Sequence, residues 1–152
     1  MADIVDSKTR SRMMSGIRGK NTKAEIEIRK KLFAAGFRYR LHDTRLPGKP
    51  DIILPKYKAV IFVHGCFWHA HDCELFKIPS TRTAFWRKKL KGNRNKDEEN
   101  DKNLKKEGWR ILTIWECAFR GAGKNREKQI DRIVEKAVKW LNSKSRYREI
   151  RG

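Results

Sequence analysis

The feature that most constrains this chain is the segment 59–73, where a short apolar run leads directly into a cluster of histidines and cysteines. Residues 59–63 are apolar and mostly β-branched, and Tyr57-Lys58 and Gly65 bound them. This pattern predicts a strand that is buried on both faces. The next ten positions, 64–73, hold three of the four histidines and two of the three cysteines. A strand that leads into a turn with reactive side chains is a common way of presenting an active site.

The net charge indicates the class of partner. The chain carries 38 Lys and Arg against 18 Asp and Glu, a formal net charge of +20. Five Trp and seven Phe are too many for a disordered basic tail. We therefore expect a folded domain that binds a polyanion, and we favour nucleic acid over a ribosomal or merely soluble role. The length of 152 residues suits a single domain, 1–152.

Sequence features also indicate the compartment. No stretch approaches the roughly 18 apolar residues of a membrane span, and the N-terminus has no apolar signal core. We therefore expect a cytoplasmic protein with no membrane partner. An odd count of three cysteines suits a reducing compartment, where thiols bind metal more often than they form disulfides.

A capping box, Thr22-Lys23-Ala24-Glu25, predicts a helix from residue 22 to about residue 35. Ile28 and Leu32 define its buried stripe, and Glu25 falls on the same stripe. Two roles remain open for Glu25. It can serve the helix start alone, or its carboxylate can point into a metal or catalytic cleft.

The segment before the central strand predicts a hairpin. Residues 37–42 alternate apolar and polar side chains, ending with Leu41 and His42, which is typical of a half-buried strand. Residues 51–54 form a short strand that turns back into the central one. Asp51 would then lie across the hairpin from the strand that ends at His64, so a role as a simple turn former becomes less favoured.

A long helix is predicted for residues 84–106, and Thr81 or Thr83 could cap it. Its middle part, 91–103, has no apolar residue, which is typical of a solvated face and, less often, of a face toward nucleic acid. One polar stripe on this helix recurs every four residues: Lys89, Asn93 and Asp97.

The C-terminal third predicts a second buried strand and a final helix. Residues 109–115 form the strand, which ends at Glu116-Cys117 and so brings the third cysteine to a strand end. Residues 127–141 form a helix whose apolar face packs on the sheet. We expect residues 143–152 to be a loose basic tail.

The N-terminal residues 6–18 predict a short helix with two interpretations. It could dock weakly on the body of the protein. Alternatively, residues 1–20 could be an arm along DNA, with Met14 and Ile17 available to wedge between bases.

Two candidate metal sites follow from the residue types. Cys66, His71 and Cys73 have the spacing C-x4-H-x-C, and Cys117 would complete a Cys₃His set of the kind that holds structural Zn²⁺. The alternative is a set of ordinary reduced cysteines. The zinc interpretation is more economical because it uses all three cysteines.

The second candidate site is rich in oxygen. Asp51, Glu25 and the carbonyl at the end of the central strand are ligands of the kind that Mg²⁺ prefers. His69 could act there as a general acid or base, since the pKa of histidine lies near neutrality. His64 could act directly or could only pack beside the site.

Several blocks of the sequence together resemble the very short patch repair (Vsr) endonucleases. They are Pro50-Asp51, Phe62–His69, Thr81–Trp86, Gly108-Trp109-Arg110 and Trp115-Glu116-Cys117. The resemblance implies an α/β, restriction-endonuclease-like fold of the PD-(D/E)XK type, a mixed sheet flanked by helices with a structural zinc site. It also implies a Mg²⁺-dependent nick in one DNA strand, on the 5′ side of the thymine in a T·G mismatch left by deamination of 5-methylcytosine.

The same resemblance assigns catalytic roles residue by residue. Asp51 and the carbonyl of Val63 would bind Mg²⁺, and His69 would be the general acid/base. Three further residues would support the site: Glu25, His64 and Asp97. The structural zinc ligands would be Cys66, His71, Cys73 and Cys117. Position 63 is Val where Thr is familiar in the family, which keeps a carbonyl ligand but removes a hydroxyl.

The resemblance also assigns DNA contacts. The side chains that enter the base stack beside the mismatch would be Phe67, Trp68 and Trp86. Met14 and Ile17 would contact the minor groove, and Lys89 and Asn93 would contact the mismatch. The implied partner is duplex DNA with a T·G mismatch, mismatch-repair proteins are further candidates, and we expect a monomer. Two alternatives remain: a zinc-stabilised DNA-binding module without catalysis, and a restriction endonuclease of the same fold.

Overall fold

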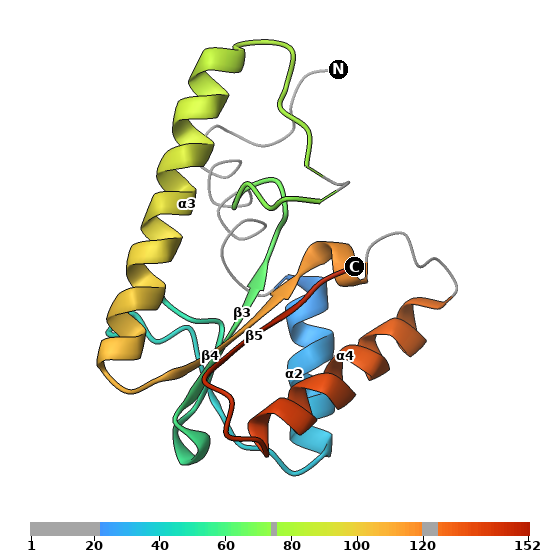
Figure 1. The fold of residues 1–152 in the computed structure, drawn as a ribbon. Coiled ribbons are helices and arrows are strands. Elements are labelled where there is room, and N and C mark those ends of the chain that lie inside the picture. Colours follow the sequence, from blue (N-terminus) through green and yellow to red (C-terminus); the bar gives the residue numbers. More distant parts are fainter. Residues whose placement is uncertain (1–21, 74–75, 120–124) are drawn as a thin grey trace, which may run out of the picture.

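A computed structural model describes residues 22–73, 76–119 and 125–152 of the chain. A five-stranded mixed sheet forms its centre (Figure 1). The strands, in spatial order, are β1 (Arg40–Leu41), β2 (Ile52–Leu54), β3 (Ala59–His64), β4 (Arg110–Trp115) and β5 (Tyr147–Ile150). The pairs β1–β2 and β2–β3 are antiparallel, whereas β3–β4 and β4–β5 are parallel.

Helices cover both faces of this sheet. Helix α3 (Thr83–Lys106) stands along one side of it, and α2 (Lys23–Ala34) and α4 (Arg126–Leu141) lie on the other (Figure 1). No helix within the described ranges is long and apolar enough to cross a membrane. The predicted α/β class is confirmed by this arrangement.

The central strand β3 is buried on both faces, as its apolar run predicts. Val60 and Phe62 pack toward α3, in a cluster that includes Leu104. Ile61 packs on the opposite face, in the larger cluster with α2 and α4. This alternation follows from the two-residue period of a strand. Apolar side chains are therefore required at consecutive positions.

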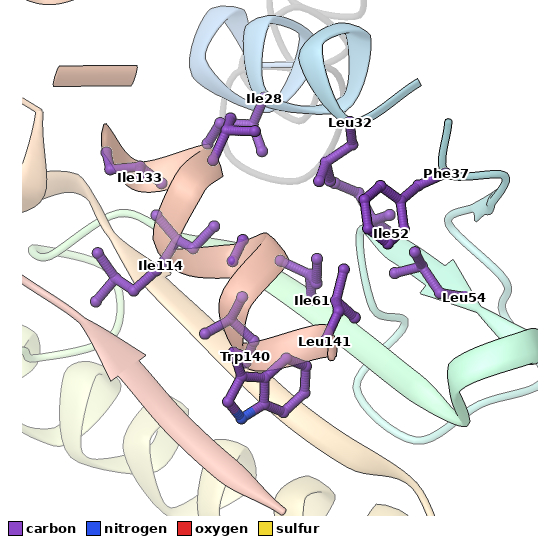
Figure 2. Close-up of a cluster of buried hydrophobic side chains, with 14 of the residues drawn as sticks. Ile28, Leu32, Phe37, Ile52, Leu54, Ile61, Ile114, Ile133, Trp140 and Leu141 are labelled. Carbon is purple, nitrogen blue, oxygen red and sulfur yellow. The ribbon is translucent and has the colours of Figure 1, made fainter. Parts of the chain in front are cut away.

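The larger core cluster joins α2 and α4 to the sheet. Ile28 and Leu32 of α2 face α4 and the strands, and Trp140 of α4 lies at the far end of the cluster (Figure 2). All three side chains are at most 2% exposed. Burial of a large apolar side chain stabilises the fold by about 1.5–3 kcal/mol. This packing fixes α2 against the sheet and so fixes the side chains at its first turn.

The predicted N-terminal cap is confirmed for α2 but not for α3. Thr22 caps α2, because its Oγ1 accepts a hydrogen bond from the Glu25 N–H at 3.2 Å. The prediction for α3 was wrong: neither Thr81 nor Thr83 caps it with its side chain. Arg82 holds the cap position in a left-handed conformation with φ 55°, and Thr83 donates instead to the Pro79 carbonyl at 2.9 Å.

Two predictions about strands need correction. The strand expected at 37–42 is only Arg40–Leu41 long, because Phe37 leaves the alternation to pack in the core. The expected loose tail, 143–152, instead contains β5. This strand forms because β4 offers it an unpaired edge, and Ile150, 3% exposed, anchors it in the core.

Candidate active site and metal centre

The parallel pairing of β3 and β4 determines where the reactive side chains meet. His64 is the register partner of Trp115, so both strands end at the same edge of the sheet. Cys66 and Cys117 lie just beyond these two ends. In the described part of the chain, this region holds three groups of potential metal ligands, and within each group the ligand atoms lie within 4.8 Å of one another.

The first group consists of Glu25, His42 and Asp51. Glu25 is 1% exposed, and its carboxylate accepts hydrogen bonds from Arg29 Nη1 at 2.7 Å and from His42 Nε2 at 2.9 Å. Asp51 Oδ2 accepts the Val63 N–H at 2.7 Å, which places this carboxylate beside the end of β3. The Glu25 carboxylate therefore lies in the site, while its backbone N–H serves the helix start.

Burial raises the pKa of Asp51 to about 8, although the hydrogen bond from Val63 N–H opposes this shift. The neighbouring Glu25 carboxylate raises the pKa further. Two buried carboxyl groups side by side are unfavourable unless a cation compensates their charge. The Asp51 and Glu25 carboxylates offer hard oxygen ligands of the kind that Mg²⁺ prefers, and His42 adds one imidazole nitrogen to the group.

The second group consists of His64, His69 and Asp97. His69 Nδ1 lies 2.5 Å from Asp97 Oδ2, which comes from α3. A carboxylate only accepts, so His69 donates from Nδ1 and its Nε2 remains available as a base. His64 stacks on the His69 ring with a centroid distance of 3.7 Å. Burial lowers the pKa of His64, with further lowering by His69 and His71, so His64 is neutral near pH 7.

The third group consists of Cys66, His71, Cys73 and Cys117. His71 Nδ1 lies 3.5 Å from Cys66 Sγ and 3.6 Å from Cys117 Sγ. None of the three cysteines forms a disulfide. Burial raises the pKa of the Cys66 thiol, which makes a thiolate there unfavourable unless a cation compensates it. One histidine nitrogen and three sulfur atoms form the donor set of a tetrahedral structural site.

The loop after β3 also carries an aromatic cluster. The ring centroid of Phe67 lies 5.1 Å from that of Trp68 and 5.5 Å from that of Trp86 on α3. None of the three belongs to a core cluster of buried residues. Asn93 Nδ2 donates to the Trp68 carbonyl at 3.0 Å, so α3 holds the loop in place.

One side of the polar stretch of α3 faces this loop. Asn93 and Asp97 bond to it, as described above, and Lys89 is exposed on the same helix. The solvated interpretation of this helix is therefore wrong for Asn93 and Asp97, whereas Lys89 is exposed as that interpretation expects. The interpretation holds for other positions, such as Glu98, whose side chain is 71% exposed.

A cleft of about 460 Å³ joins the loop to the end of β3. Its lining includes Val63, His64, His69 and Trp68. Glu116 and Arg126 also line it. Val63, His69 and two members of the aromatic cluster, Phe67 and Trp68, therefore share one concave surface, on which a polymer could contact all of them.

The structure thus brings together most of the predicted site residues, but Met14 and Ile17 lie outside the described residues. Two residues of the site region were missed. His42 had been assigned only to an alternating strand, and it reaches Glu25 because its N–H bonds to the Asp51 carbonyl at 3.3 Å. Arg126 had no assignment, since no function was placed on the residues after Arg120.

Comparisons with known proteins point to one family. The family model described as "DNA mismatch endonuclease Vsr" matches residues 2–75. A protein of that name from Escherichia coli strain K12 is 43% identical over 142 residues, which cover 93% of this chain and 88% of the relative. The type II nicking enzyme V.NmeAIP from Neisseria meningitidis is 44% identical, over 88% of this chain and 95% of its own length. A third relative, the type II nicking enzyme V.XorIIP from Xanthomonas oryzae, is 40% identical over 81% of this chain and 90% of its own length.

Proposed function

The chain belongs to the Vsr family of DNA mismatch endonucleases, and on this premise we propose that it hydrolyses one strand of duplex DNA on the 5′ side of the thymine in a T·G mismatch. The observation that carries the proposal is the proximity of two groups at the end of β3. The Asp51 carboxylate is bonded to the Val63 N–H, and the His69–Asp97 pair lies at the same strand end. A metal site beside a general base is the combination that phosphodiester hydrolysis requires.

Asp51, with the Val63 carbonyl, would hold Mg²⁺, and Glu25 would support this ion from the adjacent position. Bound Mg²⁺ would polarise the phosphodiester and offset the charge that develops on it. His69 would take a proton from the attacking water at Nε2, because its Nδ1–H is bonded to Asp97. Asp97 would stabilise the resulting imidazolium, as in other carboxylate–histidine pairs. The bond from phosphorus to the leaving sugar oxygen would then break, and that oxygen would take up a proton from solvent.

We assign structural Zn²⁺ to Cys66, His71, Cys73 and Cys117. The donor set supports this choice, because thiolate and imidazole ligands together favour zinc over magnesium. Such an ion would join the loop after β3 to the short helix η2 (Glu116–Ala118). It would thereby hold Phe67, Trp68 and His69 in their positions.

The aromatic cluster is assigned to mismatch recognition. A mismatched step is weakly stacked, so inserting a side chain there costs less than in paired DNA. Phe67, Trp68 and Trp86 would enter the stack, with Lys89 and Asn93 at the mismatch. Met14 and Ile17 would contact the minor groove.

The wider assignments follow from the same premise. We assign the mixed sheet to the restriction-endonuclease-like (PD-(D/E)XK) class, because Asp51 opens a β-hairpin whose second arm pairs in parallel with β4. We expect the enzyme to act as a monomer in the cytoplasm on duplex DNA. Mismatch-repair proteins are its candidate partners.

Asp51→Ala tests the catalytic assignment. The variant should lose nicking of a T·G duplex in Mg²⁺ by at least about 10³-fold, because the metal loses its carboxylate ligand. Its affinity for the duplex should stay within about threefold of wild type, since binding rests on other residues. Gel assays for nicking and fluorescence anisotropy for binding measure the two quantities. A wild-type protein that binds the duplex without cutting it would identify a non-catalytic DNA-binding module instead.

A further inference from the structure

One basic side chain of the cleft has no part in the chemistry above. Arg126 is the first residue of α4, far along the chain from Val63 and Trp68, yet all three line the same cleft. Its side chain is 31% exposed. Most Lys and Arg side chains in the described part of the chain are exposed, and a cation that lines the cleft is a distinct case.

The Arg126 guanidinium is held in a defined orientation. Glu27 Oε1 on α2 accepts hydrogen bonds from Arg126 Nε at 3.2 Å and from Nη2 at 3.0 Å. The Phe119 ring lies below it, with its centroid 5.4 Å from Cζ. A guanidinium has five N–H donors, and these contacts occupy one edge of the fork. Within the residues that the structure describes, Arg126 Nη1 has no hydrogen-bond partner.

We propose that Arg126, oriented by Glu27, binds a phosphodiester group of the DNA backbone next to the scissile one. The proposal rests on the proposed function, because it requires DNA in this cleft. A planar guanidinium with a free edge matches the oxygens of a phosphate, and prior orientation reduces the entropy lost on binding. A salt bridge that only joins α2 to α4 would not need to lie in the cleft.

The charge on α4 offers a matched control. Arg132 is exposed on the same helix and is not part of the cleft lining. Arg126→Gln and Arg132→Gln remove the same charge, and the glutamine side chain of the first variant could still donate a hydrogen bond to Glu27. A general loss of electrostatic attraction would therefore affect both variants equally.

The experiment measures the affinity of the full-length protein for a T·G duplex as a function of salt concentration. Arg126→Gln should bind about tenfold more weakly than wild type, and the slope of log K against log salt should fall by about 0.9, the value for one lost phosphate contact. Arg132→Gln should stay within about twofold of wild type. Equal changes in both variants would overturn the proposal.

A scan of the DNA backbone identifies the phosphate, and each protein is compared with its own binding to the unmodified duplex. Single phosphates near the nick are replaced by neutral methylphosphonates, and binding by wild type and Arg126→Gln is compared. We expect one position at which wild type loses about tenfold and the variant loses almost nothing. The same profile for both proteins would overturn the inference. A wild-type protein that fails to nick T·G duplexes would instead refute the proposed function itself.

Discussion

The Asp51 carboxylate is suited to binding a metal ion, but its negative charge is unfavourable in this buried position when no cation is bound. Burial raises the pKa of Asp51 to about 8, and the Glu25 carboxylate adds to the shift. A raised pKa means that the folded state holds the proton more tightly than the unfolded chain does. Stability is then greatest below the unfolded pKa of 3.8 and is lost as the pH rises toward 8. The same burial strengthens the attraction of the ionised pair for a cation.

Asp51→Asn tests this effect in the absence of divalent metal. Asn can still accept the Val63 N–H bond and carries no charge, so the variant should be more stable than wild type. The difference should be about 1–3 kcal/mol at pH 8.5 and should shrink as the pH falls toward 4. Urea denaturation at several pH values measures it. Mg²⁺ should then stabilise wild type and leave the variant unchanged; an equal difference at every pH would contradict the assignment.

At the scale of elements, the loop after β3 depends on contacts from several parts of the chain. Asn93 and Asp97 of α3 bond to the Trp68 carbonyl and to His69, and Cys117 after β4 lies beside His71. Residues 65–73 include no helix or strand of their own. The positions of His69 and of the aromatic cluster therefore depend on these contacts.

Cys117→Ser tests the proposed zinc site. Purified wild-type protein should carry about one zinc per chain, and the variant should lose it, because a hydroxyl is a poor ligand for zinc. The variant should also melt at a lower temperature. Elemental analysis and thermal denaturation measure the two effects. A strong chelator should destabilise wild type but not the variant, and a stable wild-type protein without zinc would refute the assignment.

Trp68→Ala tests whether the aromatic cluster recognises the mismatch. Stacking of an aromatic side chain on a base contributes about 1–3 kcal/mol, so mismatch binding should weaken about 10–100-fold. Binding to fully paired DNA should change much less, since it rests on Lys and Arg. Trp109→Ala is the control, because Trp109 precedes β4 at the opposite end of the sheet. Equal losses on both duplexes for Trp68→Ala would make this residue a packing residue.

At the scale of the whole molecule, the sequence predicts those helices and strands whose positions are determined by the local spacing of apolar residues. The capped helix α2, the buried strands β3 and β4, and helix α4 all follow from apolar spacing. The short length of β1 and the existence of the C-terminal β5 could not be predicted in this way, because both depend on pairing with a neighbouring strand. His42 and Arg126 were missed for the same reason. They enter the site through β1–β2 pairing and through the Glu27 contact between α2 and α4.

The net charge of +20 acts over the whole surface and does not distinguish one duplex from another. Discrimination must come from the cleft, where His69 lies with Phe67 and Trp68, and whose Val63 is hydrogen-bonded to the Asp51 carboxylate. Selectivity is therefore the property to test, because one cleft would both detect the mismatch and cut beside it. A restriction endonuclease of the same fold would lack this selectivity.

The most direct measurement maps the nick on end-labelled duplexes that differ only in one base pair. T·G, T·A and C·G duplexes of the same flanking sequence are incubated with wild-type protein and Mg²⁺, and both strands are resolved on denaturing gels. The account predicts a single nick in the thymine strand, on the 5′ side of the mismatched T, at a rate at least about 100-fold above that for either paired duplex. Cutting of the paired duplexes at a similar rate, or cutting of both strands, would contradict it.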